Sequence, residues 1–204
     1  MILELKHPET LALTSVSLIC AGASSAAFFL HVLDWLRMPF FINFVGLPLI
    51  VILLAIGIYA WNHHLKFWRR IRAGIAAGAA GLAAYDLVRY LVYRSKVLDY
   101  DPFHAIPILG SLITGEPAIT SSAVFAGWLY HLWNGFSFAV IYVLIAGPAR
   151  WLWGVGWAMI LEIGMLLTYP SFLAIQASVP FIAISIIGHA AYGAAIGITS
   201  RRLA

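Results

Sequence analysis

The chain has 204 residues, of which 63% are hydrophobic and 10% are charged, and its formal net charge is +4. Soluble proteins carry about 25% charged residues, so this composition excludes a soluble globular domain. The basic residues cluster near the ends of apolar segments and form no continuous stripe, which excludes nucleic acid as a partner. The single cysteine, Cys20, excludes an intrachain disulfide and a CxxC redox motif.

A helix needs about 20 apolar residues to cross the hydrocarbon core of a bilayer. Six segments of the chain meet this requirement. They are residues 11–36, 38–62, 73–93, 121–147, 151–169 and 179–199. The sequence therefore predicts an all-α, polytopic integral membrane protein, with one membrane domain over residues 1–204 that forms a six-helix bundle.

Lysine and arginine are distributed unequally between the two ends of the predicted bundle. Eight lie at the end that carries both termini, beginning with Lys6, and three lie at the opposite end. The positive-inside rule then predicts cytoplasmic termini, in a membrane of the bacterial inner (plasma) type. The basic stretch 63–72, HHLKFWRRIR, is expected to be a solvated loop between the second and third spans.

The longest connection, residues 94–120, lies at the outer end. It is too apolar for a solvated loop and too short to cross the membrane. Three prolines and two glycines interrupt it. Such a segment lies in the interface or re-enters the bilayer where protein satisfies its backbone. Two roles are open: a lid over a site, or an interfacial anchor.

The fourth predicted span contains the sequence WLYHLWNGFSFA, residues 128–139. His131 and Asn134 are three residues apart and share one helix face. Gly127 and Gly135 lie four residues on either side of the histidine and allow a neighbouring helix to approach closely. Polar groups in hydrocarbon are costly and usually face the protein interior, so this face requires a partner.

Other spans carry polar groups at a similar depth. Alternating helix directions place all of them between the bilayer centre and the outer surface. They are His31 and Asp34 in the first span, Asp86 and Arg89 in the third, Glu162 in the fifth and His189 in the sixth. The sequence therefore predicts an outer-side polar pocket built from several helices.

Imidazole and carboxylate groups suit a divalent transition metal such as zinc or iron. We expect His31, His131, His189 and Asp34 as ligands, on the pattern of catalytic zinc sites that leave one position for water. Glu162 or Asp86 would ligate or take protons. Arg89 and Asn134 would orient a polar group of the substrate. No HExxH motif supports this set. The ligands would come from the first, fourth and sixth spans, so local spacing along the sequence does not corroborate them.

These groups predict a metal-binding membrane protein. More specifically, they predict an enzyme that acts on a lipid-soluble or membrane-proximal substrate. A small proton-linked transporter using the same groups is the first alternative. A structural membrane subunit, whose polar groups only fix helix packing, is the second. Haem held by His131 and His189 is the less favoured cofactor. Small-residue faces allow a homo-oligomer as well as packing within one chain.

Overall fold

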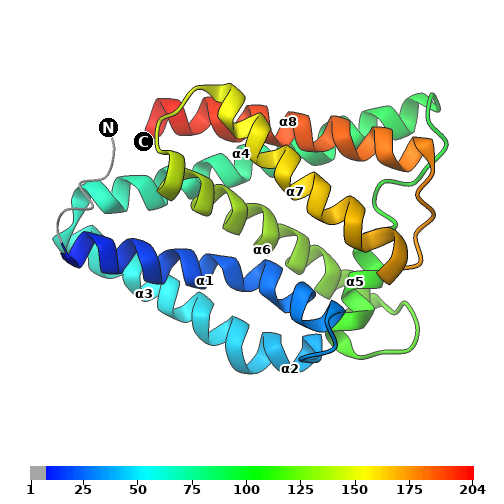
Figure 1. Cartoon of the computed structure of the whole chain (residues 1–204), viewed down its shortest axis with the longest axis horizontal. Helices are drawn as coiled ribbons and strands as arrows, with labels where there is room; N and C mark the ends of the chain where they lie inside the picture. The colour runs from blue at the N-terminus through cyan, green and yellow to red at the C-terminus, as the bar shows by residue number, and fades with distance from the viewer. Residues whose placement is uncertain (1–7) are drawn as a thin grey trace.

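Six long helices run back and forth along the bundle, so that Pro8 and Leu203 lie at the same end (Figure 1). The computed structural model describes residues 8–204. The first helix is α1 (Pro8–Val32). The second is continuous over α2 (Met38–Phe41), a π-helical turn η1 (Ile42–Gly46) and α3 (Leu47–His63). The others are α4 (Leu65–Ser95), α6 (Ser121–Ala146), α7 (Trp151–Phe172) and α8 (Val179–Leu203), with a short α5 (Ala105–Thr114) between α4 and α6.

All six long helices are long and apolar enough to cross a membrane. The described residues form no strand. The prediction of an all-α, polytopic integral membrane protein is therefore confirmed. We call the end near Pro8 and Leu203 the basic end, because seven of the described lysines and arginines lie there (Lys66, Arg69, Arg70, Arg72, Arg150, Arg201 and Arg202). Lys6, which was counted with them, lies outside the described residues. The opposite end is the α5 end.

The basic stretch 63–72 is helical and not a loop. The chain leaves the helical conformation at His64 (φ −134°, ψ 64°) and re-enters it at Leu65, so α4 begins eight residues before its predicted start at Ala73. Lysine and arginine are good helix formers, and charge alone does not end a helix. Arg70 is buried, with its guanidinium beside Gly147 at the C-terminal end of α6, where a cation is favourable.

Residues 94–120 fold back over the α5 end of the bundle. The short helix α5 lies directly on α6, because a Cβ at Gly110 would overlap the Ala123 carbonyl and a Cβ at Gly127 would overlap the Ile106 carbonyl. Glycine is therefore required at both positions for this close crossing. The apolar side of α5 packs inward through Leu109, which is 6% exposed and belongs to the core.

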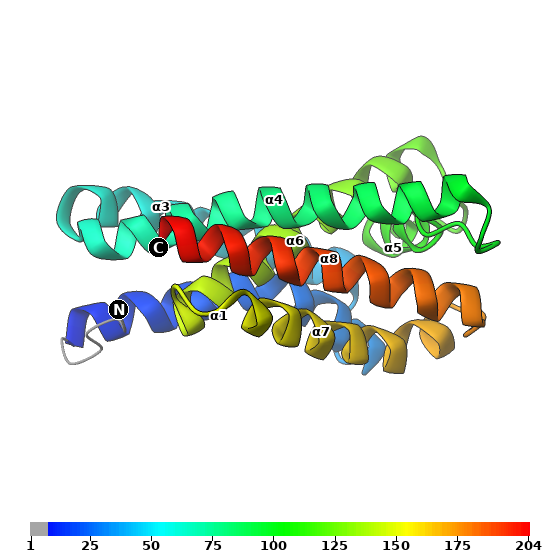
Figure 2. The ribbon, with the colours of Figure 1, turned by 90° about the horizontal axis from the view of Figure 1, so that it is seen from above.

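Glycine also fixes the closest contacts between the long helices. α8 packs along both α4 and α7 (Figure 2). A Cβ at Gly154 of α7 would overlap the Gly193 carbonyl of α8, and a Cβ at Gly81 of α4 would lie 2.7 Å from Tyr192. By contrast, α3 lies at the edge of the bundle with its apolar residues exposed, for example Val51, Leu54 and Ile58. That face is suited to contact with lipid.

Candidate functional site

A cavity of about 400 Å³ lies inside the half of the bundle nearer the α5 end. Side chains of α1, α4, α6, α7 and α8 line it, and residues of the 94–120 connection cover one end through Pro102, Ala105 and Ile106. It exists because α6 and α7 hardly touch, whereas each packs well against other helices. Its volume lies in the range of about 300–1,000 Å³ typical of small-molecule sites.

The cavity reaches the lateral surface of the bundle between α1 and α7. Near the α5 end these helices meet, where the Phe28 ring lies 5.2 Å from Tyr169 and 5.6 Å from Phe172. Towards the basic end, Ser25 of α1 and Ile160 of α7 both line the cavity, and Ile160 is 63% exposed. Because the bundle is embedded in a membrane, this opening faces lipid.

The first polar group beside the cavity joins α4 to α6. His131 Nε2 lies 3.1 Å from both carboxylate oxygens of Asp86. The same carboxylate forms an ion pair with Arg89, three residues further along α4, at 3.6 Å. That distance is too long for a good hydrogen bond. Asp86 is therefore shared between a histidine and an arginine, and its closer partner is the histidine.

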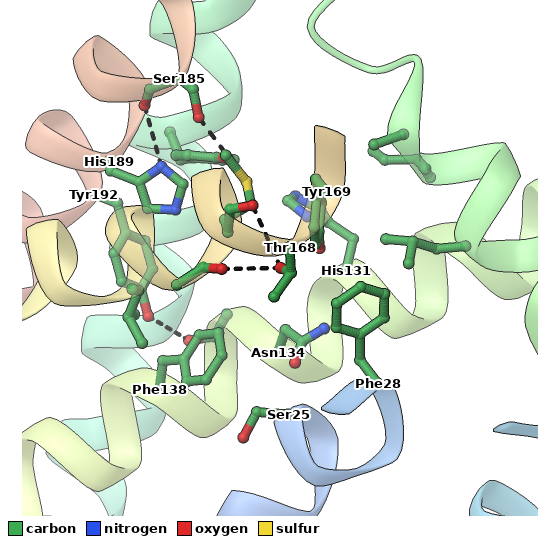
Figure 3. A pocket seen from close by; sticks show the side chains of 18 of the residues that line it. Ser25, Phe28, His131, Asn134, Phe138, Thr168, Tyr169, Ser185, His189 and Tyr192 are labelled. Carbon is green, nitrogen blue, oxygen red and sulfur yellow. Dashed lines mark hydrogen bonds between the residues drawn. The ribbon is translucent and has the colours of Figure 1, made fainter. Parts of the chain in front are cut away.

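The second polar group joins α7 to α8. Glu162 is 2% exposed, and its Oε2 accepts a hydrogen bond from the Ser185 hydroxyl at 2.8 Å and lies 2.7 Å from His189 Nδ1 in an ion-pair contact. The Ser185 carbonyl is also 3.1 Å from His189 Nδ1 (Figure 3). Both neighbours of Nδ1 are acceptors, so Nδ1 carries the proton. The neutral imidazole then has its lone pair on Nε2, which can accept a proton.

Tyr85 lies between the two groups. Its ring centroid is 5.8 Å from that of His131 and 4.9 Å from that of His189. The Arg89 guanidinium carbon lies 4.3 Å from the same ring centroid, in a cation–π contact. His131 and His189 both line the cavity. Tyr85 separates them.

Some buried polar atoms around the cavity have no hydrogen-bond partner within residues 8–204. These atoms are Arg89 Nε, Asn134 Oδ1, Trp157 Nε1 and Glu162 Oε1. Asn134 lies on α6 between Phe28 and Phe138 (Figure 3). Buried polar atoms without partners are costly and need an explanation. For Arg89, Asn134 and Trp157, which line the cavity, a group inside it that supplies donors and acceptors would provide one.

Two of the predicted site residues lie elsewhere. His31 does not line the cavity and packs edge-on against Phe172 at the α5 end. Asp34 is exposed in the turn after α1, with φ +56°. Within residues 8–204, no group of three or more His, Cys, Asp or Glu side chains is placed to hold a metal ion. Arg89, His131 and Asn134 line the cavity with His189, and Asp86 and Glu162 lie behind the two histidines, so the structure does not bring the four expected ligands together.

Several cavity residues were not predicted from the sequence. Tyr85 precedes Asp86, and Ser185 precedes His189 by one helical turn, but neither residue type is unusual in a membrane helix. The cavity face of α7 recurs at helical spacing through Trp157, Ile160, Gly164 and Thr168. That periodicity is present in the sequence, but all faces of α7 are apolar and conceal it. In the 94–120 connection, Tyr100 also lines the cavity, and burial raises the pKa of its phenol.

Fold and site together define a polytopic membrane protein with a laterally open internal cavity. Residues 68–204 match the model of a family described as a family of unknown function, DUF6789, and the chain belongs to that family. The match includes α4 to α8 and hence both histidine–carboxylate pairs, whereas the α1 wall of the cavity lies before it. No curated protein and no solved structure matches the chain.

Proposed function

We propose that this protein binds a lipid-soluble molecule in the cavity and exchanges protons with its polar end through the two histidine–carboxylate pairs. The observation that carries the proposal is the combination of an apolar cavity open towards lipid and two such pairs whose histidines line it. Ligand sites typically combine apolar walls with a few convergent polar groups in this way.

The lateral opening supports a ligand that arrives from the bilayer. A molecule entering beside the exposed Ile160 would meet apolar side chains first. It would reach His131, Asn134 and His189 only when fully inserted. A molecule with an apolar body and a polar end therefore fits the order in which the cavity presents its walls.

The histidines support proton transfer. Glu162 holds His189 through Nδ1 and leaves Nε2 as the basic nitrogen, an arrangement in which the carboxylate orients a general base. Asp86 holds His131 through Nε2 in the same manner. Each carboxylate thereby fixes the orientation of its histidine ring.

Gly164 provides a direct test. It lines the cavity, and a Cβ there would meet no atom within 4 Å, so Gly164→Leu fills the cavity without displacing a helix. Gly156, two turns earlier on α7, also has open space around its Cβ and does not line the cavity, which makes Gly156→Leu the matched control.

Lipid-soluble molecules that co-purify with each protein are extracted and identified by mass spectrometry. We expect one hydrophobic species enriched on the wild type and on Gly156→Leu, and reduced by about tenfold or more on Gly164→Leu, since the added side chain occupies its space. Identical extracts from all three proteins would refute a ligand in this cavity.

The other functions predicted from the sequence have less support. Metal-dependent catalysis lacks a cluster of ligands within residues 8–204. Proton-linked transport needs a path to both sides of the membrane. The glycine-mediated contact of α7 with α8 nearer the basic end is tight, and we see no feature there that favours transport. These alternatives stay predictions.

A further inference from the structure

Arg89 is buried but incompletely paired. It is 8% exposed, and its Nε has no hydrogen-bond partner among residues 8–204. Its ion pair with Asp86 spans 3.6 Å, and His131 lies closer to that carboxylate. A buried charge normally requires a partner with good hydrogen-bond geometry. The guanidinium of Arg89 therefore keeps unused capacity to bind an anion.

The position of this guanidinium is fixed by its surroundings. It lies 4.3 Å from the ring centroid of Tyr85 and 5.0 Å from that of Phe103. The aliphatic part of the side chain crosses α8 at Gly188, where a Cβ would lie 2.7 Å from Arg89 Cδ. These contacts hold a planar, forked donor at the wall of the cavity, and that shape matches the two oxygens of a carboxylate or phosphate.

The remaining charged groups leave Arg89 as the anion-binding element. Glu162 is already bonded to His189 and Ser185. Asp86 serves both Arg89 and His131, so the α4–α6 group carries one carboxylate against two cationic or potentially cationic side chains. An anionic ligand would supply a second negative charge to this group, whereas a cationic ligand would be repelled by Arg89.

The apolar part of the cavity gives the shape of the rest of the ligand. Its α7 wall includes Thr168 and Trp157, which are eleven residue steps apart, or about 16 Å along a helix. That length is about half of the ~30 Å hydrocarbon core. An extended acyl or isoprenoid chain fits this wall and leaves through the lateral opening.

We infer that the ligand is an anionic amphiphile, with a carboxylate or phosphate group bound to Arg89 and an apolar chain that follows α7 to the lipid-facing opening. This inference rests on the proposed function and names the chemical class of its ligand. Arg89 thus becomes the residue that determines specificity for the charged end.

The experiment compares cis-parinaric acid with its methyl ester, two fluorescent probes with the same chain and different end groups. The protein is placed in phosphatidylcholine nanodiscs, and energy transfer from tryptophan to the probe reports binding. Trp157 lines the cavity and is a nearby donor. The signal of Gly164→Leu is subtracted, because it measures probe dissolved in the lipid.

We expect the wild type to bind the acid about tenfold or more tightly than the ester, the scale of a hydrogen bond to a charged group. Arg89→Gln should reduce this preference to less than about threefold, and Arg89→Lys should keep part of it, because lysine retains the charge but loses the fork. Arg94→Gln, at the exposed end of α4, should keep the full preference. Displacement of the probe by palmitate and by hexadecyl phosphate then distinguishes a carboxylate from a phosphate end group.

Equal affinity for acid and ester in the wild type would overturn the inference while leaving the cavity as a ligand site. The same holds if Arg89→Gln, folded to the wild-type thermal midpoint, keeps the full preference. If Arg89→Gln does not fold, Arg89→Lys replaces it as the test. A reduced preference for the acid in Arg89→Lys supports the inference, and a full preference overturns it. Binding of neither probe above the Gly164→Leu signal would refute the anionic amphiphile, and the co-purification experiment would then decide the proposed function separately.

Discussion

The two halves of the bundle are built from the same long helices, but one half is tightly packed and the other contains a cavity. Near the basic end, small residues bring backbones into contact, as at Gly154 against Gly193. Near the α5 end, α6 and α7 separate, and larger side chains surround a cavity of about 400 Å³. In a membrane, tight packing is the main force that associates helices. The closed half therefore supplies stability, and the open half contains the polar groups.

Substituting glycine in the closed half should produce the largest effect on folding. Gly154→Leu places its side chain on the backbone of Gly193 and Gly197, which cannot move without separating α7 from α8. We expect a loss of about 3 kcal/mol or more, at or above the upper end of overpacking costs. Thermal unfolding in detergent measures it. Gly156→Leu, only two residues away, has open space and should leave the thermal midpoint unchanged; equal losses in both variants would contradict the proposed division.

The open half should respond most strongly at Glu162. Glu162→Ala leaves the Ser185 hydroxyl without its buried carboxylate acceptor, at about 1–3 kcal/mol, and removes the carboxylate beside His189 Nδ1, which keeps the Ser185 carbonyl. Glu162→Gln keeps an acceptor oxygen and should cost less than half as much. The same thermal measurement compares the two variants. If both lower the midpoint equally, the hydrogen bonds do not stabilise this half of the bundle.

A smaller effect is expected where Arg89 crosses α8. Gly188→Ala brings a methyl group to 2.7 Å from Arg89 Cδ, so the guanidinium must shift. We expect the preference for cis-parinaric acid over its methyl ester to fall by about threefold to tenfold, with little change in thermal midpoint. Gly22→Ala on α1 is the control, because its Cβ would meet nothing within 4 Å. An unchanged preference in Gly188→Ala would show that the position of Arg89 does not determine it.

The smallest effect lies outside the membrane spans. Glu116 accepts hydrogen bonds from Thr120 and Ser122, the latter at 2.7 Å, and these bonds lower the pKa of its carboxyl. Because the folded pKa lies below the unfolded value of about 4.3, the stabilisation is present above that pH and is lost as pH falls through the folded pKa.

Hydrogen exchange at the start of α6 should therefore accelerate in acid, in the backbone amides near the N-cap Thr120. Glu116→Gln should show the faster exchange already at neutral pH and should lose the pH dependence. An acid response that persists unchanged in Glu116→Gln would assign the effect to another group.

The sequence predicted the depth of the polar residues along the bundle better than it predicted which helix faces pack against each other. Each helical residue advances about 1.5 Å, so counting along the spans places His31, Asp86, His131 and Glu162 at comparable levels. Counting does not show which faces meet. His31 turns out to contact Phe172 outside the cavity, whereas Asp86 meets His131 because α4 packs on α6. These helix neighbours depend on small-residue contacts between distant segments, which no local pattern reveals.

Local sequence patterns also gave some helix ends incorrectly. The stretch 63–72 was predicted as a loop because of its charge, but lysine and arginine at a helix end can extend beyond the hydrocarbon while the backbone stays helical. The fifth span was predicted to end before Pro170, yet α7 continues to Phe172. Proline so near the C-terminal end of a helix still removes a hydrogen bond and ends the helix within a turn.

The opening between α1 and α7 determines which concentration governs occupancy. A molecule that enters from the bilayer equilibrates with the protein through its mole fraction among the lipids, not through its concentration in water. A sparingly soluble compound can thus fill the cavity even when its intrinsic affinity for the protein is modest, because partitioning has already concentrated it. Changes in membrane composition would then alter occupancy without any change in the protein.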